Sequence, residues 1–238
     1  MSGIVETLLV SLLPLIIAIT VHEAAHGYVA DKLGDDTARR LGRVTLNPIR
    51  HVDPVGSVIL PGLLFLSNAP FLFGYAKPVP VRFDRLNNPR WDAMWVALAG
   101  PGVNIAMALL AGLALHLVLP FTGYFGGGDE WAPGHGLANG TWAGLNGFVL
   151  VNVVLAVFNM LPVTPLDGGR VLTALLPRPL AQRYARLEPY GIVAMLLLIV
   201  VVPLAAREFG SDFNPLATIL WPPIRVVHDV VLTLTGWS

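Results

Sequence analysis

The segment ETLLVSLLPLIIAITVHEAAH (residues 6–26) joins a long apolar run to two histidines that flank a glutamate. Residues 7–21 carry no charged side chain. A helix rises about 1.5 Å per residue, so about 20 residues cross the hydrocarbon core of a bilayer. We therefore predict a membrane-spanning helix over residues 4–30, which places HEAAH (residues 22–26) near the C-terminal end of that helix.

The composition of the whole chain agrees with this placement. Hydrophobic residues make up 55% of the 238 residues, charged residues make up 13%, and the mean hydropathy is +0.67. A soluble domain carries about 25% charged residues. The formal net charge is zero, which gives no indication of a nucleic-acid partner, and the lack of cysteine excludes disulfides and thiol catalysis. We expect an all-α polytopic membrane protein whose surroundings are the lipid bilayer.

Further apolar segments follow the first one. Three of them are long enough to span a membrane: residues 91–119, 143–162 and 188–206. Two others are weaker, because 56–73 is short and rich in Pro and Gly, and 214–235 is interrupted by WPPIRVVHD. No polar stretch of about 90 residues could form a separate domain. The chain is thus expected to fold as one domain, residues 1–238, with four to six membrane-spanning helices.

The basic residues predict the orientation of these helices. Of the 15 Lys and Arg, 13 lie in three segments: 31–50, 77–90 and 170–186. The loop 120–142 has none. By the positive-inside rule, the three basic segments face the cytoplasm and the N-terminus lies outside, in the plasma membrane of a bacterium or archaeon. Both ends of 56–73 adjoin basic segments, which favours a re-entrant segment, although an ordinary span stays open.

The HEAAH sequence is typical of a metal site. Residues i and i+4 share one face of a helix, so His22 and His26 can reach one ion while Glu23 lies beside them. Neutral imidazoles suit zinc, and a catalytic zinc needs a third protein ligand and an open fourth position. A pair of polar residues that satisfy each other is the alternative, but unpartnered polar groups are costly in a membrane. We expect one Zn²⁺ per chain.

A candidate for the third ligand follows the fourth apolar segment, which ends FNMLPVTPLDGGR (residues 158–170). With the predicted orientation, Asp167 arrives at the same cytoplasmic level as the histidines. The prolines of this segment end the helix before it, and Gly168 and Gly169 are expected to let the backbone turn sharply.

Together, HEAAH and FNMLPVTPLDGGR resemble the signatures of the site-2 protease family of intramembrane zinc metalloproteases, peptidase family M50. The resemblance extends to GYAKPVPV (residues 74–81) and AGPGVN (residues 99–104) and covers most of residues 20–175. It is closest to the compact bacterial branch, which carries NPIRHVDPVGSVILP after the first motif and lacks the PDZ and CBS domains of some relatives.

The resemblance implies a set of roles. Zinc is implied on His22, His26 and Asp167, with Glu23 as the general base of a metalloendopeptidase. Asn159 matches the asparagine that helps to hold the scissile carbonyl group. The implied reaction is peptide hydrolysis within or near membrane spans, and the implied partners are single-span membrane proteins or peptides.

Two further segments are candidates for substrate contact. KPVPVRF (residues 77–83) is predicted to be a strand, part of a short membrane-associated β-hairpin or re-entrant segment. Its two prolines would direct their missing N–H groups to one edge, which leaves the N–H donors of Val79 and Val81 on the other edge, where an unwound substrate could pair. A Pro-rich surface turn is the alternative. In AGPGVN the glycines suggest close helix packing, and Asn104 is a possible substrate or active-site contact.

Other functions stay open at this stage. Membrane zinc proteases that process prenylated C-termini also carry HExxH, but their third ligand is typically a glutamate on a later helix, and neither Glu188 nor Glu208 has that context. A metal transporter would need polar residues along several helices, and these spans offer few. A non-catalytic membrane scaffold would retain its function without Glu23.

Overall fold

The computed structural model describes residues 13–59, 75–121, 136–211 and 213–237. Within these ranges every regular element is helical, in this order: α2 (Leu13–Lys32), α3 (Thr37–Arg40), η2 (Pro48–His51), η3 (Pro54–Ile59), η4 (Phe83–Arg85), α5 (Pro89–Val118), η5 (Leu119–Phe121), α6 (Gly136–Asn159), α7 (Asp167–Leu175), α8 (Arg178–Ala185), α9 (Glu188–Leu196), η7 (Leu197–Val201), α10 (Val202–Glu208) and α11 (Pro215–Leu234).

Five of the described helical stretches are long and apolar enough to cross a membrane: Leu13–Lys32, Pro89–Phe121, Gly140–Asn159, Glu188–Glu208 and Pro215–Leu234. The prediction of an all-α polytopic membrane protein is confirmed. The first four stretches correspond to the predicted spans, and the fifth covers the weaker segment 214–235.

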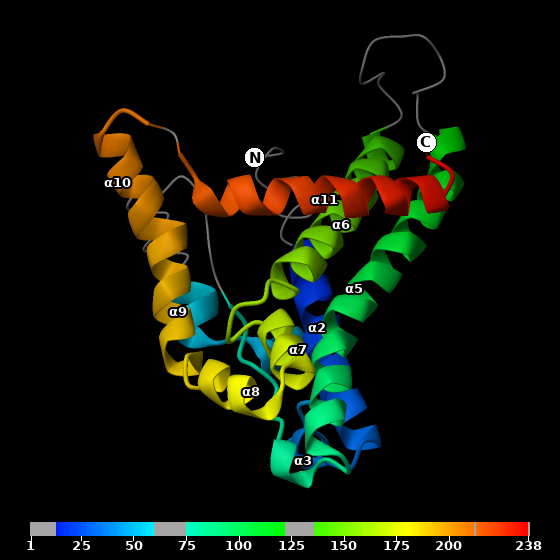
Figure 1. Cartoon of the computed structure of the whole chain (residues 1–238). Helices are drawn as coiled ribbons and strands as arrows, with labels where there is room; N and C mark the ends of the chain where they lie inside the picture. Colours follow the sequence, from blue (N-terminus) through cyan, green and yellow to red (C-terminus); the bar gives the residue numbers. More distant parts are fainter. Residues whose placement is uncertain (1–12, 60–74, 122–135, 212, 238) are drawn as a thin grey trace.

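The long helix α5 runs along one side of the bundle in the view of Figure 1 and contacts α2, α6, α7 and α11. Small residues on α5, among them Gly100, Ala108, Ala111 and Gly112, are buried in these contacts and allow the backbones to approach closely. The second half of α5 shares an apolar core cluster with α11 and with Val149 and Val153 of α6. This packing holds α2 and α7, which carry the polar motifs, against the first half of α5.

The three basic segments share one end of the molecule. In Figure 1, α3, α8 and the start of α5 lie together at the bottom. An ion pair of 3.7 Å joins Arg85 of the second basic segment to Asp36 in the first, and Arg170 of the third lies 5.0 Å from the ring of Phe83 in the second. The chain therefore has a basic end and an opposite end.

Most of the predicted re-entrant segment 56–73 lies outside the described residues, which omit 60–74. Its flanks are described. The Tyr75 N–H donates to the Gly56 carbonyl at 3.0 Å, and the Ser57 hydroxyl donates to the Tyr75 carbonyl at 2.9 Å. The two flanks thus lie side by side, as a re-entrant segment requires, and its path stays a prediction.

The predicted strand and β-hairpin around residues 77–83 are wrong, because the described residues contain no strand. Side chains bind the backbone of residues 77–82 in place of a neighbouring strand. Arg43 donates to the carbonyl oxygen of Lys77 at 2.7 Å, and the buried Asp35 accepts the N–H of Arg82 at 2.6 Å. We call residues 77–82 the strap, because these bonds tie its two ends to the segments that follow α3 and α2.

Candidate metal centre

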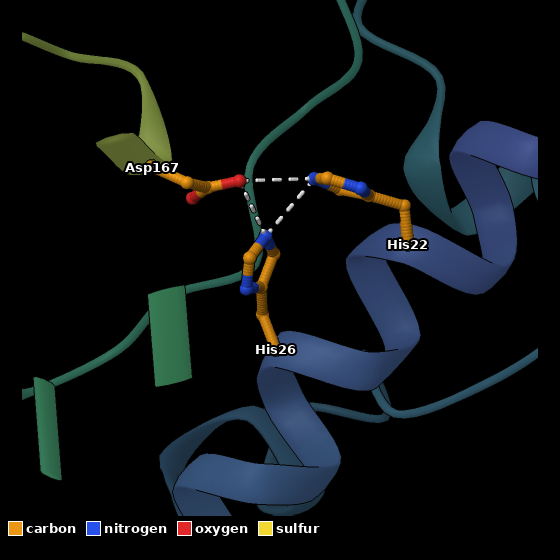
Figure 2. A group of neighbouring side chains, drawn as sticks. All are labelled: His22, His26 and Asp167. Carbon is orange, nitrogen blue, oxygen red and sulfur yellow. Dashed lines mark hydrogen bonds and ion pairs between the residues drawn. The ribbon is translucent and has the colours of Figure 1, made fainter. Parts of the chain in front are cut away.

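Helix α2 and the start of α7 bring three potential metal ligands together (Figure 2). The Nε2 atoms of His22 and His26 are 3.1 Å apart. The Oδ2 atom of Asp167 lies 3.3 Å from the first and 3.4 Å from the second. The three side chains are between 7% and 13% exposed. The spacing of HEAAH therefore places both imidazoles on the helix face that meets Asp167.

Each imidazole is oriented by a hydrogen bond to its other nitrogen. His26 Nδ1–H donates to the Val96 carbonyl oxygen on α5 at 2.7 Å, and His22 Nδ1–H donates to the side-chain oxygen of Asn104 at 2.5 Å. With Nδ1 protonated, Nε2 of each neutral ring keeps a lone pair that points into the centre. Helix α5 thus selects the tautomer that a metal ligand needs.

Asp167 is placed by the end of α6 and by α5. Helix α6 ends at Asn159, a turn follows, and α7 begins at Asp167. Arg90 of α5 donates to the carbonyls of Ala174 and Leu176 at 2.7 Å each, which caps the far end of α7.

The expected sharp turn at Gly168 and Gly169 is not found. They lie inside α7, and a Cβ on Gly168 would stand 2.2 Å from the Met160 carbonyl oxygen. Their role is close packing.

The three ligand atoms fit a zinc ion. Two lone-pair nitrogens and a carboxylate oxygen face one another, and Asp167 Oδ2 is buried without a hydrogen-bond partner. Such a group of acceptors is unfavourable unless a cation lies among them. In a tetrahedral zinc site with bonds of 2.0–2.1 Å, ligand atoms are about 3.3 Å apart. The separations of 3.1, 3.3 and 3.4 Å match that value.

Behind His22 lies a chain of fully buried amides. Asn104, whose side chain accepts the bond from His22, donates to Asn152 of α6 at 2.7 Å, and Asn152 donates to the Phe148 carbonyl at 2.8 Å. Both asparagines are 0% exposed. Asn104 contacts the metal centre through His22, and its predicted contact with substrate stays a prediction.

Replacing Asn104 with alanine should weaken zinc binding by about 10–100-fold, because groups that orient a metal-ligating histidine have effects of this size. Zinc retention against a graded chelator series measures the change. Asn104→Asp keeps an acceptor for His22 Nδ1–H and should retain more zinc than Asn104→Ala. Equal retention by all three proteins would contradict an orienting role.

Because Gly100 has no side chain, the two imidazoles can occupy the space beside it. A Cβ at this position would stand 2.5 Å from His22 Nε2 and 2.5 Å from His26 Nε2. The AGPGVN pattern indicates only helix packing for this glycine. No local sequence signal distinguishes it from Gly102, whose Cβ would meet nothing within 4 Å.

Glu23 lies beside the metal ligands and contacts the strap. Its Oε2 accepts the backbone N–H of Val79 at 2.8 Å. Asn159, at the end of α6, donates its side-chain amide to the Leu155 carbonyl at 2.9 Å. The structure therefore brings all five principal candidates (His22, Glu23, His26, Asn159 and Asp167) to one cavity.

That cavity has a volume of about 120 Å³ and is lined by His22, Glu23, His26, Pro78, Val79, Val81, Val96, Ala97, Asn159, Pro165, Asp167 and Arg170. Both strap valines line it, so a substrate there would meet them, and their role in binding stays a prediction. Sequence reasoning missed Arg170. Its guanidinium is 3.9 Å from the Glu188 carboxylate and joins the site to the start of α9.

Comparisons with known proteins agree with this chemistry. Peptidase family M50 matches residues 10–201. The chain is 35% identical over 224 residues to the Bacillus subtilis protein named "Putative zinc metalloprotease YwhC", a match that covers 92% of this chain and 88% of YwhC. It is 30% identical over 196 residues to Rip2 of Mycobacterium tuberculosis, which carries the same description, and the match covers 82% of this chain and 68% of Rip2.

No solved structure matches the chain. The family match alone covers more than three quarters of the sequence, and its residues 10–201 include every member of the candidate metal centre. The chain therefore belongs to peptidase family M50, and its relatives are named as zinc metalloproteases.

Proposed function

We propose that the protein is a zinc-dependent intramembrane endopeptidase that hydrolyses peptide bonds within or near the membrane spans of other proteins. The observation that carries this proposal is the position of the centre. Two histidines and a carboxylate converge next to a glutamate on helices whose length and apolar composition suit a membrane. A water-activating site in such a helix bundle suits a substrate that also lies in the membrane.

One zinc per chain would be held by His22, His26 and Asp167. When bound, it supplies a Lewis acid that lowers the pKa of water and polarises a carbonyl group. Glu23 accepts the proton of the attacking water and passes it to the leaving amine. The Asn159 side-chain amide turns from the Leu155 carbonyl to donate to the oxygen of the scissile carbonyl. The cavity has room for a carbonyl group and a few waters.

The substrate would be a single-span protein or peptide that enters sideways from lipid. A helix in lipid hides its peptide bonds in its own hydrogen bonds, so it must unwind locally before attack. Gly, Pro or Asn near the cut should therefore favour cleavage. The basic end would face the cytoplasm, from which water would reach the metal centre. The N-terminus would lie on the other side of the membrane.

The zinc requirement is tested by reconstituting the purified protein with a single-span substrate. The wild type should contain about one zinc per chain, lose cleavage on chelation and regain it when zinc is returned. His22→Ala should lack both zinc and cleavage. Full zinc occupancy in His22→Ala, or cleavage unaffected by chelation, would overturn the proposal.

The orientation is tested separately. Because the chain has no cysteine, a single cysteine at Arg40, in α3 of the first basic segment, gives a specific labelling site. An impermeant maleimide should label it only after the cells are permeabilised. Labelling in intact cells would place the basic end outside.

A further inference from the structure

Both termini of the last helix, α11, lie at the side of the molecule opposite the basic end. It follows α10, which completes the stretch Glu188–Glu208. That stretch starts at the basic end, where Glu188 pairs with Arg170, and 21 residues of helix are about 30 Å long. The start of α11 is therefore far from the basic end.

The other end of α11 is bound to the far end of α5. The Thr235 carbonyl oxygen is 2.6 Å from His116 Nε2, and the Trp237 indole N–H donates to the Gly112 carbonyl at 2.8 Å. The Trp237 and His116 rings stack with centroids 4.3 Å apart. His116 lies 27 residues beyond the start of α5, which is about 40 Å along the helix. A helix that crossed the membrane after α10 would instead end near the basic loops.

Figure 1 shows the same arrangement, with α11 running crosswise over the upper part of the bundle, near the upper ends of α5, α6 and α10. Leu220, Ile224 and Val231 form its buried stripe and pack on the core cluster of α5 and α6. Helix α11 therefore closes this end of the bundle.

The opposite face of α11 is mostly polar. Thr218, Arg225, Asp229 and Thr233 are all exposed, and their spacing of seven, four and four residues places them in one row along the helix, which also holds the exposed Pro222. Between this row and the buried stripe lies an apolar flank of Ile219, Val226 and Val230, each more than half exposed. A helix with a buried stripe, an apolar flank and a polar face suits the boundary between lipid and water.

We propose that α11 lies in the plane of the membrane at the end opposite the basic loops, with its apolar flank in the boundary between headgroups and acyl chains. Its partner on that flank is the lipid surface, and its polar row faces water. Four of the five candidate helices then cross the bilayer. If α11 crossed instead, the exposed Arg225 and Asp229 would lie in the inner part of the span with no described part of the protein covering their face, which is costly in hydrocarbon.

Single cysteines in this cysteine-free chain test the placement. Thr218→Cys, Arg225→Cys and Thr233→Cys put thiols near the start, middle and end of the polar row. All three should react with an impermeant maleimide from one side of the membrane, opposite to Arg40→Cys. This same-side criterion holds whichever end of the protein faces the cytoplasm. All four positions are exposed, so the fold should be retained, which a monodisperse elution profile in detergent checks.

Leu197→Cys is the matched control for a position in lipid, because Leu197 is 48% exposed and lies near the middle of the stretch Glu188–Glu208. Arg225→Cys should react at least about tenfold faster, because only the thiolate reacts and apolar surroundings raise the pKa of a thiol by a unit or more. Labelling of Thr218→Cys and Thr233→Cys from opposite sides would overturn the proposal, as would equal rates for Arg225→Cys and Leu197→Cys. Neither result bears on zinc binding or cleavage.

Discussion

Replacing Glu23 with glutamine should lower kcat by about 1,000-fold, within the range that a general base contributes. Glutamine keeps the shape of glutamate and can still accept the N–H of Val79, so the strap and the metal ligands should stay in place. What it loses is the carboxylate that, in the proposed mechanism, accepts a proton from water. Bound zinc should therefore be unchanged while cleavage nearly disappears.

Single-turnover cleavage of a reconstituted substrate, measured beside the zinc content of the same sample, separates these effects. A protein that acts as a scaffold or a metal transporter would keep its activity in Glu23→Gln. Cleavage by this variant at the wild-type rate would remove Glu23 from the reaction, and loss of zinc would show that glutamine disturbs the centre itself.

Replacing Gly100 with alanine should have the second large effect, on zinc binding and on cleavage together. The new methyl group would stand 2.5 Å from the Nε2 atoms of both histidines. Either the imidazoles or α5 must move, and a displacement of about 1 Å at a catalytic group costs about 100-fold in rate. Zinc retention should fall as well, because the two Nε2 atoms no longer meet Asp167 in the same geometry.

Gly102→Ala is the matched control. It makes the same substitution two residues away on the same helix, where a Cβ meets nothing within 4 Å. Zinc retention and initial cleavage rates of the two variants should be measured in parallel. Equal values for both would show that the space beside the imidazoles is not needed, and equal losses would indicate a general effect on α5.

Much of the candidate site follows from local rules. The spacing of His22 and His26 places both rings on one helix face, and the prolines before Asp167 end α6 where the third side chain is needed. The membrane-spanning helices were equally predictable, because a helix that crosses a bilayer needs a long apolar segment. These inferences rest on periodicity and on the cost of polar groups in lipid, both of which can be read along the chain.

The contacts between helices could not be read in this way. The close approach of Gly100 to the imidazoles and the bond between Asn104 and His22 join α5 to α2, and their partners are 74–82 positions away in the sequence. The strap was mistaken for a strand because Val79 and Val81 alternate with prolines. Its partners include the side chains of Glu23, Asp35 and Arg43, which no strand pattern indicates.

The most direct test of the central claim is to map the bond that the reconstituted protein cuts in a single-span substrate. Mass spectrometry of both fragments should place the cut within the substrate span or at its edge on the side of the basic loops. A run of leucines at that position should slow cleavage, since a stable helix resists unwinding in lipid, and Glu23→Gln should produce no fragments. Cuts that map only to soluble loops away from the span, at a rate unaffected by the leucine run, would contradict an intramembrane protease.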